Sequence, residues 1–265
     1  MTDWLWLVLC GLTSGFLAGL LGIGGGFVVV PAMLLLIPPS VAPLDRLPQM
    51  AVATSLAAMI PTTVAALVAQ WRRGAVDVHW LRRLGPGVCL GAIAGAMLLP
   101  HIAAQAVAAI FLVYAVYFAL RLLLAPHGVR LPTPWVRWPV WVLATTIGGI
   151  SVLAGVGGAI FTVPYLESRE LRMTSATATS SGVGLLLSLV AVVLFAGKAL
   201  WLAGNAYSVD WVWWSGAAII GAVAMLSAPL GVKAAHHAPV AVLKRAFALL
   251  LVCAAGSAIW KLQAL

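Results

Sequence analysis

The chain has 265 residues, of which 63% are hydrophobic and 8% are charged, and its formal net charge at pH 7 is +9. A soluble domain carries roughly 25% charged residues, so this composition excludes a water-soluble globular protein. The continuous apolar runs also exclude a β-barrel, whose strands show only alternating hydrophobicity. They predict an all-α polytopic membrane protein.

Eight apolar segments follow one another along the chain. The first is too long for one straight crossing, because ~20 residues span the hydrocarbon core. Glycine clusters interrupt the first and the fifth segments. No secretory signal peptide is expected, since MTDWLWLVLC has an aspartate, no basic residue and no A-x-A-like site after it. The segments run over residues 4–37, 48–70, 84–99, 103–124, 138–165, 174–197, 211–232 and 239–260.

The first segment contains GLLGIGGGFVVVP at residues 19–31, where a straight helix would otherwise run. Each glycine in a helix interior costs about 1 kcal/mol relative to alanine. Close helix packing is one interpretation, and it suits Gly87, Gly91 and Gly95, which are spaced by four. Consecutive glycines favour a broken helix, whose freed N–H groups and positive dipole end point into a cavity and bind an anion. The main-chain ligands predicted here are Gly22, Gly24, Gly25 and Gly26.

A second block, VLAGVGGAIFTVP at residues 152–164, aligns with the first residue for residue. In the same order, AVATS at 51–55 matches ATATS at 176–180, and the stretch around Gly95 matches the stretch around Gly231. Three matched blocks in one order predict an internal repeat, which is typical of secondary transporters. The ligands predicted in the second block are Gly155, Gly157 and Gly158.

The repeat divides the chain into a first half of residues 1–130 with segments one to four, and a second half of residues 131–265 with segments five to eight. Four crossings in each half give parallel repeats, whereas an odd number gives inverted ones. Re-entrant pieces in the first and fifth segments would change the count. The sequence therefore leaves both arrangements open.

Hydroxyl pairs recur at the start of the segments that follow the two glycine blocks. Most serines and threonines in membrane helices bond to the carbonyl four residues earlier or to a neighbouring helix. We expect the repeated pairs instead to complete the anion site with uncharged donors. These residues are Thr54 and Ser55 in the first half and Thr179 and Ser180 in the second.

Ionisable side chains cluster after each glycine block, where an ordinary interfacial loop would also explain them. The functional alternative is that such residues gate the pathway, attract the solute or relay a proton. The residues considered for gating or coupling are Gln49, Glu167, Glu170 and Arg172.

The basic residues lie mostly in loops, where membrane topology explains them without a nucleic-acid partner. With eight crossings, the loop after segment 48–70 and the link between the halves lie on one side. The positive-inside rule makes that side cytoplasmic. Both termini then face the cytoplasm, with nine basic residues inside and six outside.

Several motifs of other protein classes are missing from the sequence. It has no GxxxxGK[ST] P-loop, no HExxH motif and no cluster of histidines and carboxylates within the spans. No Ser–His pair at membrane depth supports an intramembrane enzyme. We therefore expect no catalytic residue, no metal site and no cofactor, although an intramembrane enzyme or a partner-binding scaffold stays as an alternative class.

The two glycine blocks, each followed by a Thr-Ser helix start (VATS and TATS), resemble the TauE/SafE family of sulfite and sulfonate exporter-like permeases. The resemblance covers essentially the whole chain. It implies a multi-pass carrier of the bacterial inner membrane for sulfite, sulfoacetate, thiosulfate or a similar solute, coupled to protons or sodium. The sequence departs from the family pattern where the second block reads GGA, and where Met50 precedes AVATS in place of a frequent basic residue.

These observations together predict a secondary transporter that moves a small anion by alternating access at a site between the halves. Its partners would be membrane lipid and the anionic solute, and the sequence allows a homodimer. A passive anion channel is the main alternative, and a carrier for another small organic acid is a further one. The solute, the direction of transport and the coupling ion stay open.

Overall fold

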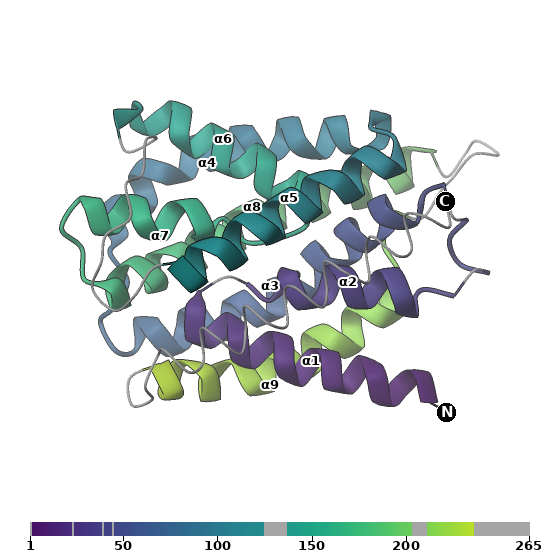
Figure 1. The fold of residues 1–265 in the computed structure, drawn as a ribbon, viewed down its shortest axis with the longest axis horizontal. Coiled ribbons are helices and arrows are strands. Elements are labelled where there is room, and N and C mark those ends of the chain that lie inside the picture. Colours follow the sequence, from purple (N-terminus) through teal and green to yellow (C-terminus); the bar gives the residue numbers. More distant parts are fainter. Residues whose placement is uncertain are drawn as a thin grey trace.

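The computed structural model describes residues 2–22, 24–38, 40–43, 45–124, 137–202 and 211–235, and the predicted segment 239–260 lies outside them. The described part of the chain contains helices and no strands, in agreement with the predicted all-α class. Figure 1 shows how they are arranged. The helices are α1 (Thr2–Leu21), α2 (Gly26–Leu36), α3 (Leu47–Trp71), α4 (Val78–Leu98), the 3-10 turn η1 (Leu99–His101), α5 (Ala104–Leu124), α6 (Val140–Ala154), α7 (Ala159–Ser168), α8 (Met173–Leu202) and α9 (Trp214–Ala235).

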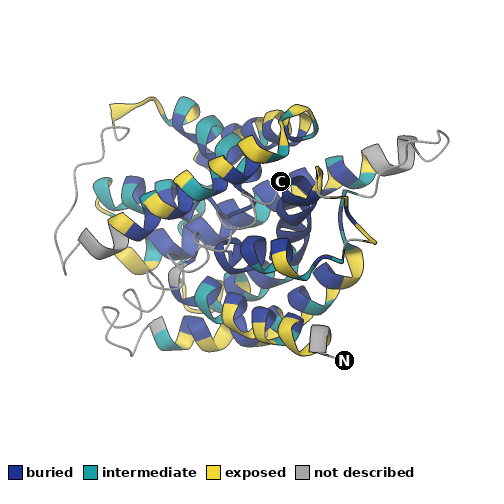
Figure 2. Ribbon diagram, turned by 45° about the vertical axis from the view of Figure 1, so that its right-hand side comes forward, coloured by how far each residue is buried: buried dark blue, intermediate teal, exposed yellow. Residues whose placement is uncertain are grey.

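Four of these helices are long and apolar enough to cross a membrane by themselves, namely α3 with the segments Val78–His101, Met173–Gly197 and Trp214–Ala234. Shorter apolar helices are found at Trp4–Leu20, Gly26–Leu36, Ala104–Leu120 and Val140–Ala154. Large apolar side chains such as Val113, Val193 and Leu226 are exposed on the outside. The yellow outer faces in Figure 2 surround a buried interior. An apolar surface of this kind is suited to lipid.

Small residues allow two pairs of helices to pack closely. A Cβ on Gly91 would collide with the carbonyl oxygen of Thr145, so α4 approaches α6 backbone to backbone. Gly15 of α1 lies in the same way against the Ala224 carbonyl of α9. Figure 1 shows α1 and α9 along one side of the molecule and α4 and α6 along the other. The predicted packing role of Gly87, Gly91 and Gly95 is confirmed, because a Cβ on any of the three would meet atoms of α6 at 3.2 Å or less.

Neighbouring residues give the direction of each helix. Gly11 lies against Val223 and Gly19 against Val232, so α1 and α9 run parallel. In α3, Thr54 accepts the N–H of Trp213 just before α9, and Pro61 lies against Gly221 further along α9, so α3 also runs parallel to α9. By the same reasoning α4, α6 and α8 run parallel to one another. Because a short connection joins the end of α3 to the start of α4, this second group runs antiparallel to the first.

The two groups of helices define two ends of the molecule. We call the end where α1, α3 and α9 begin the N-terminal end, and the end where α4, α6 and α8 begin the arginine end. The eight-crossing scheme places the N-terminus and the loop after α3 on one side, but the structure places them at opposite ends. The reason is that segment 4–37 folds back on itself, so that α2 ends at the same end of the molecule at which α1 begins.

Candidate functional site

The first glycine block breaks the helix after α1, as predicted. Gly22, Gly24 and Gly25 have φ angles of +68°, +80° and +81°, which L side chains rarely adopt and glycine adopts freely. Helix α2 then begins at Gly26 and returns to the N-terminal end. With 11 residues it is about 16 Å long, roughly half the ~30 Å hydrocarbon thickness. The break therefore forms the inner tip of a helical hairpin.

The second block breaks the chain in the same way between α6 and α7. Gly155 ends α6 with a φ of +68°, and its N–H and that of Val156 donate back to the carbonyls of Val152 and Ser151 at 3.1 and 3.0 Å. The Gly158 carbonyl accepts the N–H groups of Phe161 and Thr162, which start α7. Helices α6 and α7 form a second hairpin that enters and leaves at the arginine end. The predicted interruption is confirmed at both blocks.

The two breaks touch each other inside the molecule. A Cβ on Gly26 would collide with the carbonyl oxygen of Gly155 and would lie 2.8 Å from the Cα of Val156. The hydroxyl of Ser55 in α3 donates to the same Gly155 carbonyl at 2.9 Å. All the predicted glycine ligands are buried, as are Thr54, Ser55, Thr179 and Ser180. The structure therefore brings the first break, the second break and the start of α3 together.

Thr54 and Thr179 make corresponding hydrogen bonds across the chain. The Oγ1 of Thr54 accepts the N–H of Trp213, just before α9, at 3.0 Å. The Oγ1 of Thr179 accepts the N–H of Asp77, just before α4, also at 3.0 Å. Both threonines therefore use an oxygen lone pair to fix a neighbouring helix start. Their O–H groups still carry a proton that can be donated.

Several buried main-chain donors at the breaks lack acceptors. Within the part of the chain that the structure describes, no hydrogen bond engages the N–H groups of Gly24, Gly25 and Gly26 at the first break, or of Gly157, Gly158 and Ala159 at the second. Buried N–H groups are almost always hydrogen-bonded in native proteins, to protein or to water. Such a set of free donors is suited to the oxygens of an anion.

The second break also carries hydroxyl groups that no sequence motif predicts. Ser151 is fully buried, its Oγ has no hydrogen-bond partner among the described residues, and it lies 3.5 Å from the position of a Cβ on Gly158. The hydroxyl of Tyr114 approaches Ser151 and lies a long 3.5 Å from the Gly157 carbonyl oxygen. Ser180 in α8 is likewise buried, and the described part of the chain offers its hydroxyl no hydrogen-bond partner. No motif marks a single serine in an apolar helix, so only the fold reveals Ser151.

The four residues considered for gating lie away from the breaks or are engaged elsewhere. Gln49 is buried, and its Nε2 donates to the Ile102 carbonyl at 2.9 Å, while no described residue bonds to its Oε1. Glu167 is half-buried in α7, about 13 Å along the helix from the second break. Glu170 and Arg172 are exposed in the turn between α7 and α8. The structure thus gathers the acidic candidates and Arg172 at the arginine end.

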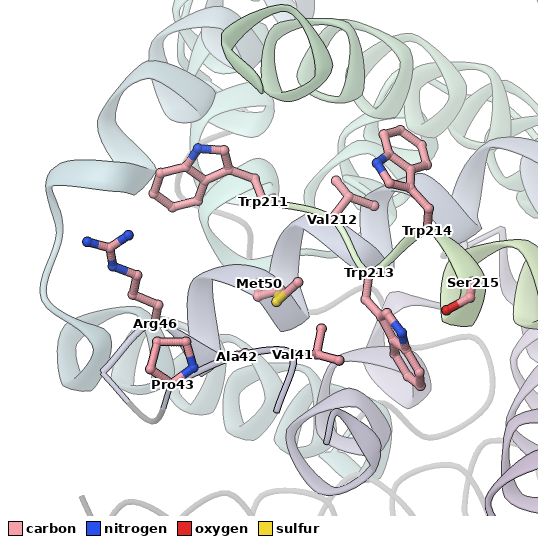
Figure 3. A pocket seen from close by; sticks show the side chains of 10 residues that line it. All are labelled: Val41, Ala42, Pro43, Arg46, Met50, Trp211, Val212, Trp213, Trp214 and Ser215. Carbon is pink, nitrogen blue, oxygen red and sulfur yellow. The ribbon is translucent and has the colours of Figure 1, made fainter. Parts of the chain in front are cut away.

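A separate pocket opens at the N-terminal end. It has a volume of about 600 Å³ and lies between the loop before α3 and the stretch before α9. Figure 3 shows Arg46 on one side, Met50 at the centre and the indoles of Trp211, Trp213 and Trp214 around it. The N–H of Trp213 donates to Thr54, so one wall of the pocket is bonded to α3.

Potential metal ligands do not gather anywhere in the described ranges. No group of three or more histidine, cysteine, aspartate or glutamate side chains is found there. The polar centre consists of main-chain groups and hydroxyls, and its charge is zero. Dipoles and hydrogen-bond donors are therefore the polar interactions that this centre offers.

These features define a multi-pass helical membrane protein with two broken helices at its centre. The family model for the sulfite exporter TauE/SafE matches residues 7–258. A protein of Haemophilus influenzae (strain Rd) named "Probable membrane transporter protein" is 30% identical over 257 residues, which cover 94% of this chain and 95% of that protein. No solved structure matches the chain. The chain belongs to the TauE/SafE family and is a membrane transporter, not an enzyme.

Proposed function

We propose that this chain is a secondary transporter that moves a small anion, a sulfur oxyanion or an organosulfonate, by alternating access at the paired breaks. The observation that carries the proposal is the set of free, buried N–H groups at both breaks. Oriented N–H groups at helix N-termini bind anions, and broken helices at half-membrane depth are where secondary transporters bind solutes. Uncharged donors also hold an anion weakly enough to release it.

The proposed ligands are the glycines of both breaks, with hydroxyls around them. The Ser55 hydroxyl already donates to Gly155, and the Thr54 and Thr179 oxygens already accept main-chain N–H groups. Thr54 and Thr179 keep an O–H group that can be donated, and the hydroxyls of Ser151 and Ser180 have no hydrogen-bond partner among the described residues. We add Ser151 to the predicted set, which comprises Gly22, Gly24, Gly25, Gly26, Thr54, Ser55, Gly155, Gly157, Gly158, Thr179 and Ser180.

We infer that residues 1–130 and 131–265 form two repeats of inverted orientation. The hairpin α1–α2 opens at the N-terminal end and its counterpart α6–α7 at the arginine end. Helices α3 and α4 run opposite to their counterparts α8 and α9. Inverted repeats are a common basis of alternating access, because the two repeats can exchange conformations around one fixed site.

We also propose an orientation in the inner membrane. Arginines and lysines gather at the arginine end, whereas Arg46 is the one arginine or lysine side chain described at the N-terminal end. The positive-inside rule then places the arginine end in the cytoplasm and the start of α1 outside. This differs from the cytoplasmic N-terminus expected from eight crossings. The described residues at the arginine end are Arg72, Arg73, Arg82, Arg83, Arg137, Arg169, Arg172 and Lys233.

A flux assay with Ser151→Ala tests the proposed site. The purified protein is reconstituted into liposomes, and efflux of sulfite, thiosulfate and sulfoacetate is measured with and without proton and sodium gradients. We expect saturable flux that falls about tenfold in Ser151→Ala, since the solute loses one buried hydrogen bond. The matched control is Ser188→Ala, because Ser188 is equally buried but donates to Leu185 in its own helix.

Two outcomes would contradict the proposal. Flux that rises linearly with solute and ignores both gradients would indicate the alternative, a passive anion channel. Equal flux in Ser151→Ala and Ser188→Ala would remove the second break from the solute site.

A further inference from the structure

The pocket at the N-terminal end combines one positive charge with apolar walls. Arg46 is exposed beside it, and no described carboxylate forms an ion pair with its guanidinium. The wall consists of indole rings together with Met50 and Val212. Figure 3 shows the guanidinium of Arg46 facing the same space as the ring of Trp211. A single unpaired cation at the rim of an apolar pocket is complementary to one negative charge on an apolar body.

The position of Arg46 on its helix also favours an anion. Arg46 is the N-cap residue of α3, and the first turn of α3 contains no acidic residue. The N-terminus of a helix carries the positive end of the dipole, where a cation is unfavourable and an anion is stabilised. An anion in the pocket would interact with both the guanidinium and the helix terminus. It would offset a placement of Arg46 that is otherwise unfavourable.

The size of the pocket selects an organic molecule. Pockets of about 300–1,000 Å³ are typical of organic ligands, and this one measures about 600 Å³. A bare inorganic oxyanion would leave most of the apolar wall uncovered. Aromatic rings that face a ligand add stacking and dispersion contacts.

The pocket is connected to the paired breaks through α3. Trp213 in its wall donates to Thr54, and the adjacent Ser55 donates to Gly155 at the second break. A ligand that moves the stretch before α9 therefore acts on a residue next to the central contact. Hydrogen bonds of two adjacent residues of α3 therefore link the wall of the pocket to the second break.

We propose that this pocket binds a monoanionic organic molecule with an apolar body, with the anionic group at Arg46 and the body against the tryptophans. Its role as an access site on the outer face rests on the proposed function, whereas the binding itself does not. The occupant we infer is a free solute. An anionic phospholipid has the same chemistry, and the test below separates the two sources.

Binding is measured on the full-length protein in nanodiscs of phosphatidylcholine, with p-toluenesulfonate as the probe and calorimetry and tryptophan fluorescence as readouts. We expect saturable binding that weakens about tenfold or more in Arg46→Gln. The matched control is Arg82→Gln, because Arg82 is an exposed arginine of α4 that does not line the pocket. Trp211→Ala should weaken binding of p-toluenesulfonate and leave that of methanesulfonate, which lacks the ring, unchanged.

Several results would overturn the proposal. The first is equal binding of p-toluenesulfonate in Arg46→Gln and Arg82→Gln, and the second is equal affinity for p-toluenesulfonate and sulfite. The third is loss of p-toluenesulfonate binding when the nanodiscs contain 30% phosphatidylglycerol, because that loss would assign the pocket to lipid. Because Arg46 is exposed, size-exclusion chromatography should show an intact fold in the variant. Arg46-dependent binding without any flux would support the pocket and refute the proposed anion transport. Flux without Arg46-dependent binding would refute the pocket and leave the proposed function intact.

Discussion

Gly26→Ala adds a single methyl group where the two breaks touch, and this group should push the breaks apart. Its neighbours on the far side are main-chain atoms, the Gly155 carbonyl oxygen and the Val156 Cα. Neither belongs to a flexible side chain that can rotate away. Its φ angle is not positive, so Gly26→Ala introduces a collision without a conformational penalty of its own.

The magnitude follows from the spacing at this contact. The added carbon would lie 2.8 Å from the Val156 Cα, whereas carbon atoms pack best at ~3.5–4.0 Å. The hairpins must therefore separate by about 0.7 Å or more. Overpacking of this kind costs ~1–3 kcal/mol in a well-packed interior. We expect Gly26→Ala to lower the free energy of unfolding by that amount and to reduce flux strongly, since the free N–H groups of both breaks move apart.

Gly184→Ala provides the matched control. Gly184 is buried in α8, and a Cβ there would make ordinary contacts at 3.6 Å with Thr63 and 3.8 Å with Met59. Alanine gains up to about 1 kcal/mol over glycine in a helix, so this variant should be neutral or stabilised. Unfolding in SDS or by heat and flux in liposomes are measured on both variants. Equal stability and equal flux in Gly26→Ala and Gly184→Ala would refute the reasoning that the breaks are in tight contact.

Three further predictions concern the helix contacts and the orientation. Thr54→Val and Thr179→Val should each lower the free energy of unfolding by ~1–3 kcal/mol, because the N–H of Trp213 or Asp77 loses its acceptor. Thr62→Val is the control and should cost less, since it loses only a bond to Ala58 in its own helix. An equal loss in all three variants would argue against the bonds of Thr54 and Thr179. Gly91→Val should destabilise the protein by several kcal/mol in the same assay, since its side chain would enter the Thr145 carbonyl; wild-type stability would contradict the packing of α4 on α6. In a cysteine-free background, a membrane-impermeant maleimide added to intact cells should label Val41→Cys and not His79→Cys, two exposed positions at opposite ends, and the reverse pattern would invert the proposed orientation.

The sequence predicted the places where helices break better than the directions in which they run. Gly22, Gly24, Gly25 and Gly155 identify the breaks because their conformations depend on the glycines themselves. The directions of the helices were not predicted, because apolar composition depends on the surroundings of a segment. It is the same for a helix that crosses the membrane and for a hairpin that turns back. Segment 4–37 is apolar throughout, and only its packing shows that α2 turns back.

The side-chain roles at the centre depended on contacts between distant parts of the chain. Thr54 accepts the N–H of a residue 159 positions away, and Thr179 accepts one 102 positions away. Their recurrence in the sequence coincides with corresponding hydrogen bonds in the structure, but it could not distinguish a solute ligand from an acceptor that fixes a helix start. Ser151 has no counterpart signal, since the first block carries Ala18 at the aligned position.

The hydrogen bonds at the centre link each proposed repeat to the other. Thr54 in the first repeat fixes the start of α9 in the second, and Thr179 in the second fixes the start of α4 in the first. Ser55 adds a bond from the first repeat to Gly155 at the second break. A movement of the hairpin α6–α7 changes the bond from Ser55, and a movement of the hairpin α1–α2 changes the contact between Gly26 and Gly155. In the proposed alternating access, these links between the repeats would couple opening at one end to closing at the other.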